Sequence, residues 1–212
     1  MSPRHHPSQA LLMDLAAGTL EPGQRLVVGV HVGACEACRR EVALAEAVGG
    51  ALLEDLDPAP MAPDALALAL ARIERPEAPA PAAPPRRAEG IVVPGEVTEA
   101  AARRRRWVAP GVWVAPVIGG PKGKRSYLLR VAAGMAVPLH GHRGAEMVCV
   151  LKGAYADGDA VHGEGDFALN DETHVHRPRV ADDGECVCLI AVQGDLIARD
   201  WIGRLFQPFV GI

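Results

Sequence analysis

Residues 134–153, with the sequence GMAVPLHGHRGAEMVCVLKG, decide the fold of the larger part of this chain. They follow the spacing G-x5-H-x-H-x3-E-x6-G, in which the outer glycines allow tight turns. His140 and His142 are two residues apart, so on a β-strand both side chains point to the same face. We expect Glu146 to reach that face after a short turn. The three side chains would then converge on one metal ion inside a small β-barrel.

The sequence around this motif is typical of an all-β structure. Short runs rich in Val, Leu and Ile alternate with turns rich in Gly, Pro and Asp, which indicates a sandwich or a barrel. The predicted strands cover residues 112–118, 126–132, 146–151 and 186–192. Within this part we expect His162 in a surface loop, and Cys149, Cys186 and Cys188 in packing rather than as ligands.

The motif at 134–153 resembles the first motif of the cupin superfamily, which implies a jelly-roll β-barrel that binds a metal. The second cupin motif is weaker here, but His176-x-Pro178 resembles the context of its histidine ligand. The resemblance therefore implies a fourth ligand at His176. His174 has the same strand parity and remains the alternative; otherwise it is a polar residue beside the site. Three histidines and one carboxylate suit zinc or another divalent transition metal.

The first 75 residues carry a helical pattern instead. Ser8 is a good N-cap for a helix to about residue 17, and Pro22 suits the first turn of a second helix that includes His31. A third helix is predicted over 35–49 and a fourth over 65–74. The fourth places Leu66, Leu70 and Ile73 on one face, which we expect to bind a partner protein.

A proline-rich stretch, PEAPAPAAPP at residues 76–85, separates the two patterns. Proline fixes φ and disfavours helix in the residue before it, so this stretch is predicted to be a semi-rigid spacer. The chain is therefore interpreted as α+β and multidomain. A small zinc-binding helical bundle over 1–75 is followed by a linker over 76–89 and a cupin β-barrel over 90–212.

A second metal site is predicted in the helical part. His31, Cys35 and Cys38 form the pattern H-x3-C-x2-C, and the two cysteines at a helix start face the same way. A helix N-terminus also favours the thiolate form. A closed structural zinc site needs a fourth ligand, for which we choose His6, with His5 as the alternative.

This motif with its upstream histidine resembles the zinc-binding anti-sigma domain, and the order of the two parts resembles the ChrR-type anti-sigma factors. The resemblance implies that the helical part clasps an extracytoplasmic-function sigma factor in a 1:1 heterodimer and blocks its association with RNA polymerase. It also implies release in response to singlet oxygen or related oxidants, sensed through the cupin part. The alternative is a metal-dependent cupin oxygenase or isomerase with an accessory zinc domain.

Composition agrees with a regulator that contacts neither DNA nor membrane. The net charge of −4 disfavours a basic nucleic-acid binder, and no apolar run is long enough to span a bilayer. The first residues lack the apolar core of a secretion signal, so a cytoplasmic location is expected. Five cysteines in such a chain indicate metal or thiol chemistry rather than a disulfide framework.

Overall fold

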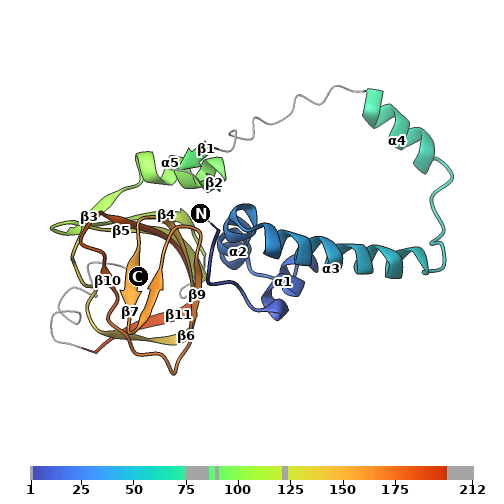
Figure 1. Ribbon diagram of the computed structural model, residues 1–212. Helices are drawn as coiled ribbons and strands as arrows, with labels where there is room; N and C mark the ends of the chain where they lie inside the picture. Colours follow the sequence, from blue (N-terminus) through green and yellow to red (C-terminus); the bar gives the residue numbers. More distant parts are fainter. Residues whose placement is uncertain (1, 75–85, 89–90, 121–123, 200–212) are drawn as a thin grey trace.

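The computed structural model describes residues 2–74, 86–88, 91–120 and 124–199, and it contains both a helical part and a β-barrel (Figure 1). The helices are α1 (Gln9–Ala16), α2 (Pro22–Ala34), α3 (Glu36–Glu54), α4 (Ala65–Glu74) and α5 (Gly95–Arg103). The strands are β1 (Arg86–Ala88), β2 (Ile91–Val93), β3 (Arg106–Ala109), β4 (Val112–Ile118), β5 (Lys124–Val131), β6 (His140–Lys152), β7 (Tyr155–Asp157), β8 (Ala160–His162), β9 (Phe167–Asn170), β10 (Arg179–Val180) and β11 (Cys186–Ala198).

The helix starts follow the capping signals in the sequence. The side chain of Ser8 accepts a hydrogen bond from the amide of Leu11, and Pro22 occupies the first turn of α2. The predicted end of the third helix at residue 49 was wrong, because α3 continues to Glu54. Glycine inside a helix costs only about 1 kcal/mol, and the alanine and leucines that follow Gly50 favour continuation.

The β-strands form a barrel from two facing sheets. The larger sheet has the strand order β3-β4-β5-β11-β6-β9, and the smaller has the order β10-β7-β8. The strands β6 and β11 pair antiparallel along almost their whole length, from Val187 opposite Lys152 to Ala198 opposite His140. Both strands are longer than predicted, and α5 and the β1–β2 pair were not predicted from the sequence.

The larger sheet is buried on both faces over its middle, which explains the continuous apolar runs at 147–151 of β6 and 186–192 of β11. Tyr127, Val148 and Ile190 belong to a cluster on the barrel side. Leu128, Cys149 and Leu189 belong to a second cluster that also contains Val27 and Val28 of α2. The helical part and the barrel therefore share one hydrophobic core, although the linker predicted over 76–89 lies outside the described residues except for the strand at 86–88.

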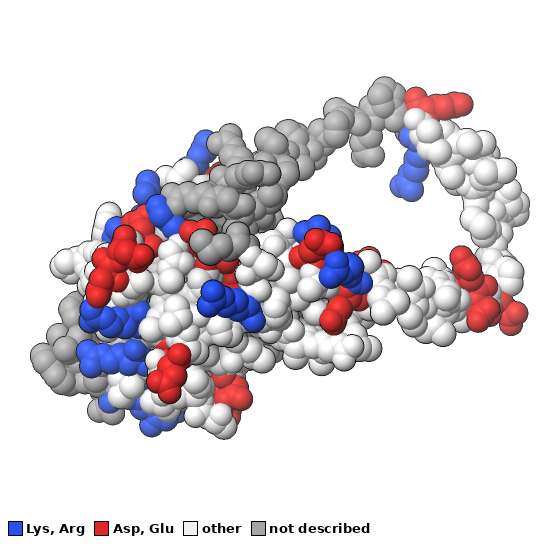
Figure 2. Space-filling view, viewed as in Figure 1, with Lys and Arg blue, Asp and Glu red and all other residues white. Residues whose placement is uncertain are grey.

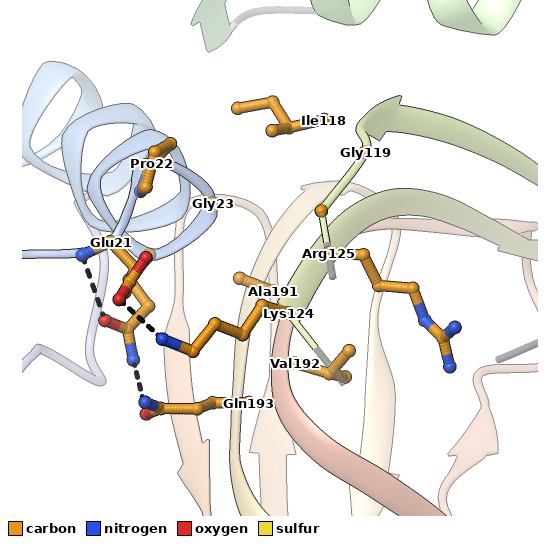
Figure 3. A pocket seen from close by; sticks show the side chains of 12 residues that line it. Glu21, Pro22, Gly23, Ile118, Gly119, Lys124, Arg125, Ala191, Val192 and Gln193 are labelled. Carbon is orange, nitrogen blue, oxygen red and sulfur yellow. Dashed lines mark hydrogen bonds and ion pairs between the residues drawn. The ribbon is translucent and has the colours of Figure 1, made fainter. Parts of the chain in front are cut away.

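Polar contacts add to this packing where the start of α2 meets the first residue of β5 and its neighbour on β11 (Figure 3). Lys124 Nζ lies 2.7 Å from Glu21 Oε1, and Gln24 donates a hydrogen bond to Gln193. A pocket lies between these residues, lined on one side by α2 and on the other by β5 and β11. Within the described part of the chain, no helix is both long and apolar enough to cross a membrane.

Candidate metal centres

The first centre lies where α2 meets α3, against the chain that precedes α1. The structure brings together one ligand atom from each of His6, His31, Cys35 and Cys38, all within 4.8 Å of one another. His31 comes from the last turn of α2, Cys35 lies between the two helices, and Cys38 lies in the first turn of α3. Only His6 of the four is exposed.

The spacing of these atoms fits a tetrahedral zinc ion. His6 Nδ1 lies 3.5 Å from the sulfur of Cys35 and 3.5 Å from that of Cys38, and His31 Nε2 lies 3.3 Å from Cys38 Sγ. Zinc bonds of about 2.3 Å to sulfur and 2.0–2.1 Å to nitrogen give a tetrahedral edge of roughly 3.5 Å. Two thiols and two imidazoles are also the donor types of a closed structural site.

Burial keeps two of these side chains uncharged when no cation is bound. Burial lowers the pKa of His31, and burial followed by the contact with Cys35 raises the pKa of Cys38 to about 12. Both shifts disfavour ionised side chains, and a divalent cation reverses this balance for the thiols because it stabilises the thiolate directly.

His5, the alternative to His6, lies elsewhere. Its Nδ1 is 3.2 Å from the carboxylate of Asp166 on the barrel, and its ring lies 4.3 Å from that of His162. The expectation of a surface loop for His162 was wrong, because this residue ends β8 and is 9% exposed, stacked against Tyr155. The sequence pattern gave no sign that the chain before α1 would contact His162.

The second centre lies inside the barrel. One ligand atom from each of His140, His142, Glu146 and His176 falls within 4.8 Å of the others. The first three lie on β6, and an isolated β-bridge pairs His176 with His140. Glu146 follows on the same continuous strand, so the short turn predicted after His142 was wrong.

Glycines shape this strand between the two groups of ligands. Gly144 has φ of 103° and lies opposite Gly194 of β11, which has φ of 123°. A side chain at Gly144 would collide with the carbonyl oxygen of Gln193, and one at Gly194 with that of Arg143. Glycine at both positions therefore allows the two long strands to approach closely between His142 and Glu146.

Hydrogen bonds fix which histidine nitrogens face the centre. His140 Nδ1 lies 2.8 Å from the carbonyl oxygen of Pro138, and His176 Nδ1 lies 2.6 Å from Asp157 Oδ2. Since both partners can only accept, each Nδ1 carries the proton and each Nε2 presents a lone pair. These two Nε2 atoms lie 3.0 Å apart, a repulsive approach for two lone pairs that a shared cation makes favourable.

The distances between the ligand atoms of the barrel site, and the charge states of its side chains, also fit a bound metal ion. His142 Nε2 is 3.1 Å from His176 Nε2, near the ~3.0–3.4 Å expected between neighbouring nitrogen ligands at metal–nitrogen bonds of 2.0–2.1 Å. Burial, then the neighbouring histidines, lower the pKa of His142 to about 4. Burial raises the pKa of Glu146, and a cation at the centre would favour its ionised form.

His174 lies outside this group of four. It is an exposed residue whose Nε2 contacts Asp157, the carboxylate that also holds His176. Cys186 and Cys188 are buried with their sulfurs 3.6 Å apart, and Cys149 is fully buried, so none of them reaches either centre in the described residues.

Two helices of the helical part, α3 and α4, carry exposed apolar side chains. Leu66, Leu70 and Ile73 of α4 are 71%, 51% and 80% exposed, and no residue of α4 is buried in the described part of the chain. A second exposed stripe, not predicted from the sequence, lies on α3 and is formed by Leu44, Val48 and Leu52 at helical spacing. The outer half of α3 and most of α4 show few charged side chains, apart from an acidic group where the helices are joined and charges at the end of α4 (Figure 2).

Comparison with known proteins places both parts in one family. Residues 95–194 match the family model described as the ChrR cupin-like domain. The chain is 38% identical over 218 residues to the anti-sigma-E factor ChrR of Cereibacter sphaeroides, and the alignment covers both chains fully. It also resembles the anti-sigma ChrR in the crystal structure of its complex with Rhodobacter sphaeroides SigE. That match has a TM-score of 0.75 and 34% identity, and covers 90% of this chain and all of the other. The chain described here therefore belongs to the ChrR family of anti-sigma factors.

Proposed function

We propose that this protein is an anti-sigma factor that binds an extracytoplasmic-function sigma factor in a 1:1 complex and prevents its association with RNA polymerase. The observation that carries this proposal is the apolar surface on α3 and α4, in the same helical part as a cluster that fits structural zinc. A monomer rarely exposes so many large apolar side chains on two successive helices without a partner for them. The full-length similarity to an anti-sigma factor identifies the class of that partner.

Zinc is proposed to hold the helical part in the conformation that binds. The cluster joins the chain before α1, the end of α2 and the start of α3, and these helices carry no Phe, Tyr or Trp to enlarge a core of their own. Structural zinc supplies on the order of 10 kcal/mol of folding free energy in small domains. Zinc would thus fix the direction in which α3 leaves the bundle, and with it the position of the apolar stripe.

The barrel is proposed to bind zinc or another divalent transition metal through His140, His142, Glu146 and His176, and to act as the sensor. Oxidation at or near this site by singlet oxygen or a related oxidant would release the sigma factor. The facing Nε2 lone pairs of His140 and His176 support a resident metal. The alternative of a cupin oxygenase or isomerase is disfavoured, because the whole chain aligns with an anti-sigma factor. The proposed location is the cytoplasm, where the sigma factor would act.

Co-expression with the sigma factor tests the proposal. The full-length chain should co-purify with it at a 1:1 ratio and should suppress transcription from a promoter that depends on it. Exposure of the complex to singlet oxygen should restore transcription. A chain that neither co-purifies nor suppresses would refute the anti-sigma assignment, and a complex that survives the oxidant would refute the sensing step alone.

A further inference from the structure

A single short segment of the barrel, residues 165–170, contacts both metal centres. We propose that this segment couples the centres, so that a metal bound in the barrel raises the affinity of the zinc site at His6, His31, Cys35 and Cys38, and the reverse. The proposal rests on the metal assignments made under the proposed function. It assigns to Asp166 and Asn170 a positioning role for ligands that they do not themselves provide.

At its first end, the segment holds a zinc ligand. The carbonyl oxygen of Gly165 lies 2.7 Å from Nδ1 of His31, and both residues are buried. Because a carbonyl only accepts, Nδ1 carries the proton and Nε2 is left free to bind zinc. The ring of Phe167 lies edge-on to His31 at a centroid distance of 6.0 Å, which restricts rotation of the imidazole.

Asp166 holds the chain that leads to a second ligand. Its Oδ1 accepts hydrogen bonds from the amides of Arg4 and His5, the two residues directly before His6. The amide of Phe167 donates to the carbonyl oxygen of His5 at 3.0 Å. Asp166 is 4% exposed and its Oδ2 is fixed by the amide of Gly163, so the carboxylate has little freedom to move.

At its other end, the segment holds a ligand of the barrel site. The strand β9 pairs with β6 so that Asn170 lies opposite Glu146, and Asn170 Nδ2 donates to Glu146 Oε2 at 3.0 Å. Both side chains are buried. This hydrogen bond orients the carboxylate toward the three histidines, as partners of metal ligands usually do.

The backbone of β9 connects the contact with the zinc ligands to the contact with Glu146, so a displacement at one end is passed to the other. Phe167 and Asn170 are three residues apart on one strand, about 10 Å, and both are fixed in register against β6. A shift of Asn170 that follows a change at Glu146 therefore moves the turn at Gly165 and Asp166 unless ladder hydrogen bonds break. Because such a linkage is reciprocal, zinc at the first centre must favour metal at the second by the same factor.

Cobalt(II) measures the coupling in the full-length chain. Charge transfer from thiolate to cobalt reports only the cysteine-containing centre, since the proposed barrel site has no sulfur ligand. His140→Ala should empty the barrel site and weaken cobalt binding at the cysteine centre by at least about fivefold. Asp166→Ala should weaken it about tenfold, within the range for partners of metal ligands. The exposed carboxylate variant Asp183→Ala is the matched control and should bind like wild type.

The double variant locates the coupling. If the segment carries it, His140→Ala should change cobalt affinity by less than twofold in an Asp166→Ala background, and likewise in an Asn170→Ala background. Asp166→Asn keeps an oxygen acceptor for Arg4 and His5 but loses the acceptor for the amide of Gly163, so it should weaken cobalt binding less than Asp166→Ala does. That result would separate loss of these hydrogen bonds from a misfolded barrel.

Failure of the coupling can be distinguished from failure of the metal assignments and of the anti-sigma proposal. If His140→Ala abolishes barrel metal but leaves cobalt affinity within twofold of wild type, the coupling is refuted while both metal assignments stand. Fully additive effects in the double variant would refute the role of residues 165–170. If the wild-type barrel binds no metal at all, the barrel assignment and the coupling fall together, and inhibition of the sigma factor still tests the anti-sigma proposal separately.

Discussion

The carboxylate of Asp157 lies 2.6 Å from Nδ1 of His176, on the opposite side of the imidazole from the nitrogen that faces the barrel centre. The same oxygen, Oδ2, lies 3.1 Å from Nε2 of His174. Burial alone would raise the pKa of Asp157, but the hydrogen bonds with His176 and His174 hold it below its ordinary value. Asp157 is therefore ionised at neutral pH and fixes the tautomer of His176.

Removal of this carboxylate should weaken the barrel site without removing a ligand. Asp157→Ala should lower metal affinity about 10–100-fold, because His176 loses the partner that orients its ring. Metal content of the purified chain, measured under chelator competition, checks this. Asp159→Ala is the control, since Asp159 is an exposed acidic residue in the adjacent turn. Equal affinities in both variants would contradict the role of Asp157.

The ligands themselves should separate sensing from inhibition. His140→Ala and Glu146→Ala should remove the barrel metal and blunt the response to oxidant, while basal inhibition at saturating zinc remains. His174→Ala should lose less metal than His176→Ala, because only His176 lies in the group of four. Metal analysis and a reporter of sigma activity check both points. Loss of metal in His174→Ala with retention in His176→Ala would invert the assignment.

Loss of a cysteine should disable the helical part. Cys35→Ala or Cys38→Ala should release zinc and the sigma factor together, because the fold of the bundle and its affinity for zinc are linked. Zinc content and co-purification measure the two effects in one preparation. A zinc-free variant that still inhibits would show that the helices hold their arrangement without the metal.

The exposed face of α4 should contribute directly to the complex. Burial of one apolar side chain is worth about 1.5–3 kcal/mol, so Leu70→Glu should weaken sigma binding at least tenfold with zinc still bound. Leu68 is also exposed but lies about 200° around the helix from Leu66, so Leu68→Glu is the matched control. Similar losses in both variants would show that α4 does not bind through the face of Leu66, Leu70 and Ile73.

The chain truncated after residue 85 should still inhibit the sigma factor at saturating zinc, because the zinc cluster, α3 and α4 all precede that point. It should not respond to oxidant. Truncation exposes Val27 and Val28, which pack against the barrel, so a lower melting temperature than that of the full-length chain is also expected. A reporter assay and thermal unfolding test these outcomes, and absence of inhibition would mean that the barrel contributes to the sigma interface.

Sequence patterns over short spans predicted the helices, the strands and the metal motifs. They could not predict the contacts between the helical part and the barrel. Helix caps, strand patterns and both metal motifs depend on residues close in sequence, and the structure contains the corresponding helices, barrel and clusters. The contacts of Asp166 with Arg4 and His5 join residues more than 160 positions apart, and no periodicity encodes them. The stripe on α3 was incomplete in the prediction because the helix was ended at Gly49, before Leu52.

The glycine pair at positions 144 and 194 should be under selection only in chains that respond through the barrel. A substitution at either position would push β6 and β11 apart beside the barrel ligands, yet would touch no zinc ligand and no residue of the apolar helix faces. Selection for inhibition of the sigma factor alone would tolerate such substitutions. Selection for release of the sigma factor through the barrel would remove them. Related chains that have lost glycine at both positions should therefore be those that inhibit constitutively and no longer answer the signal.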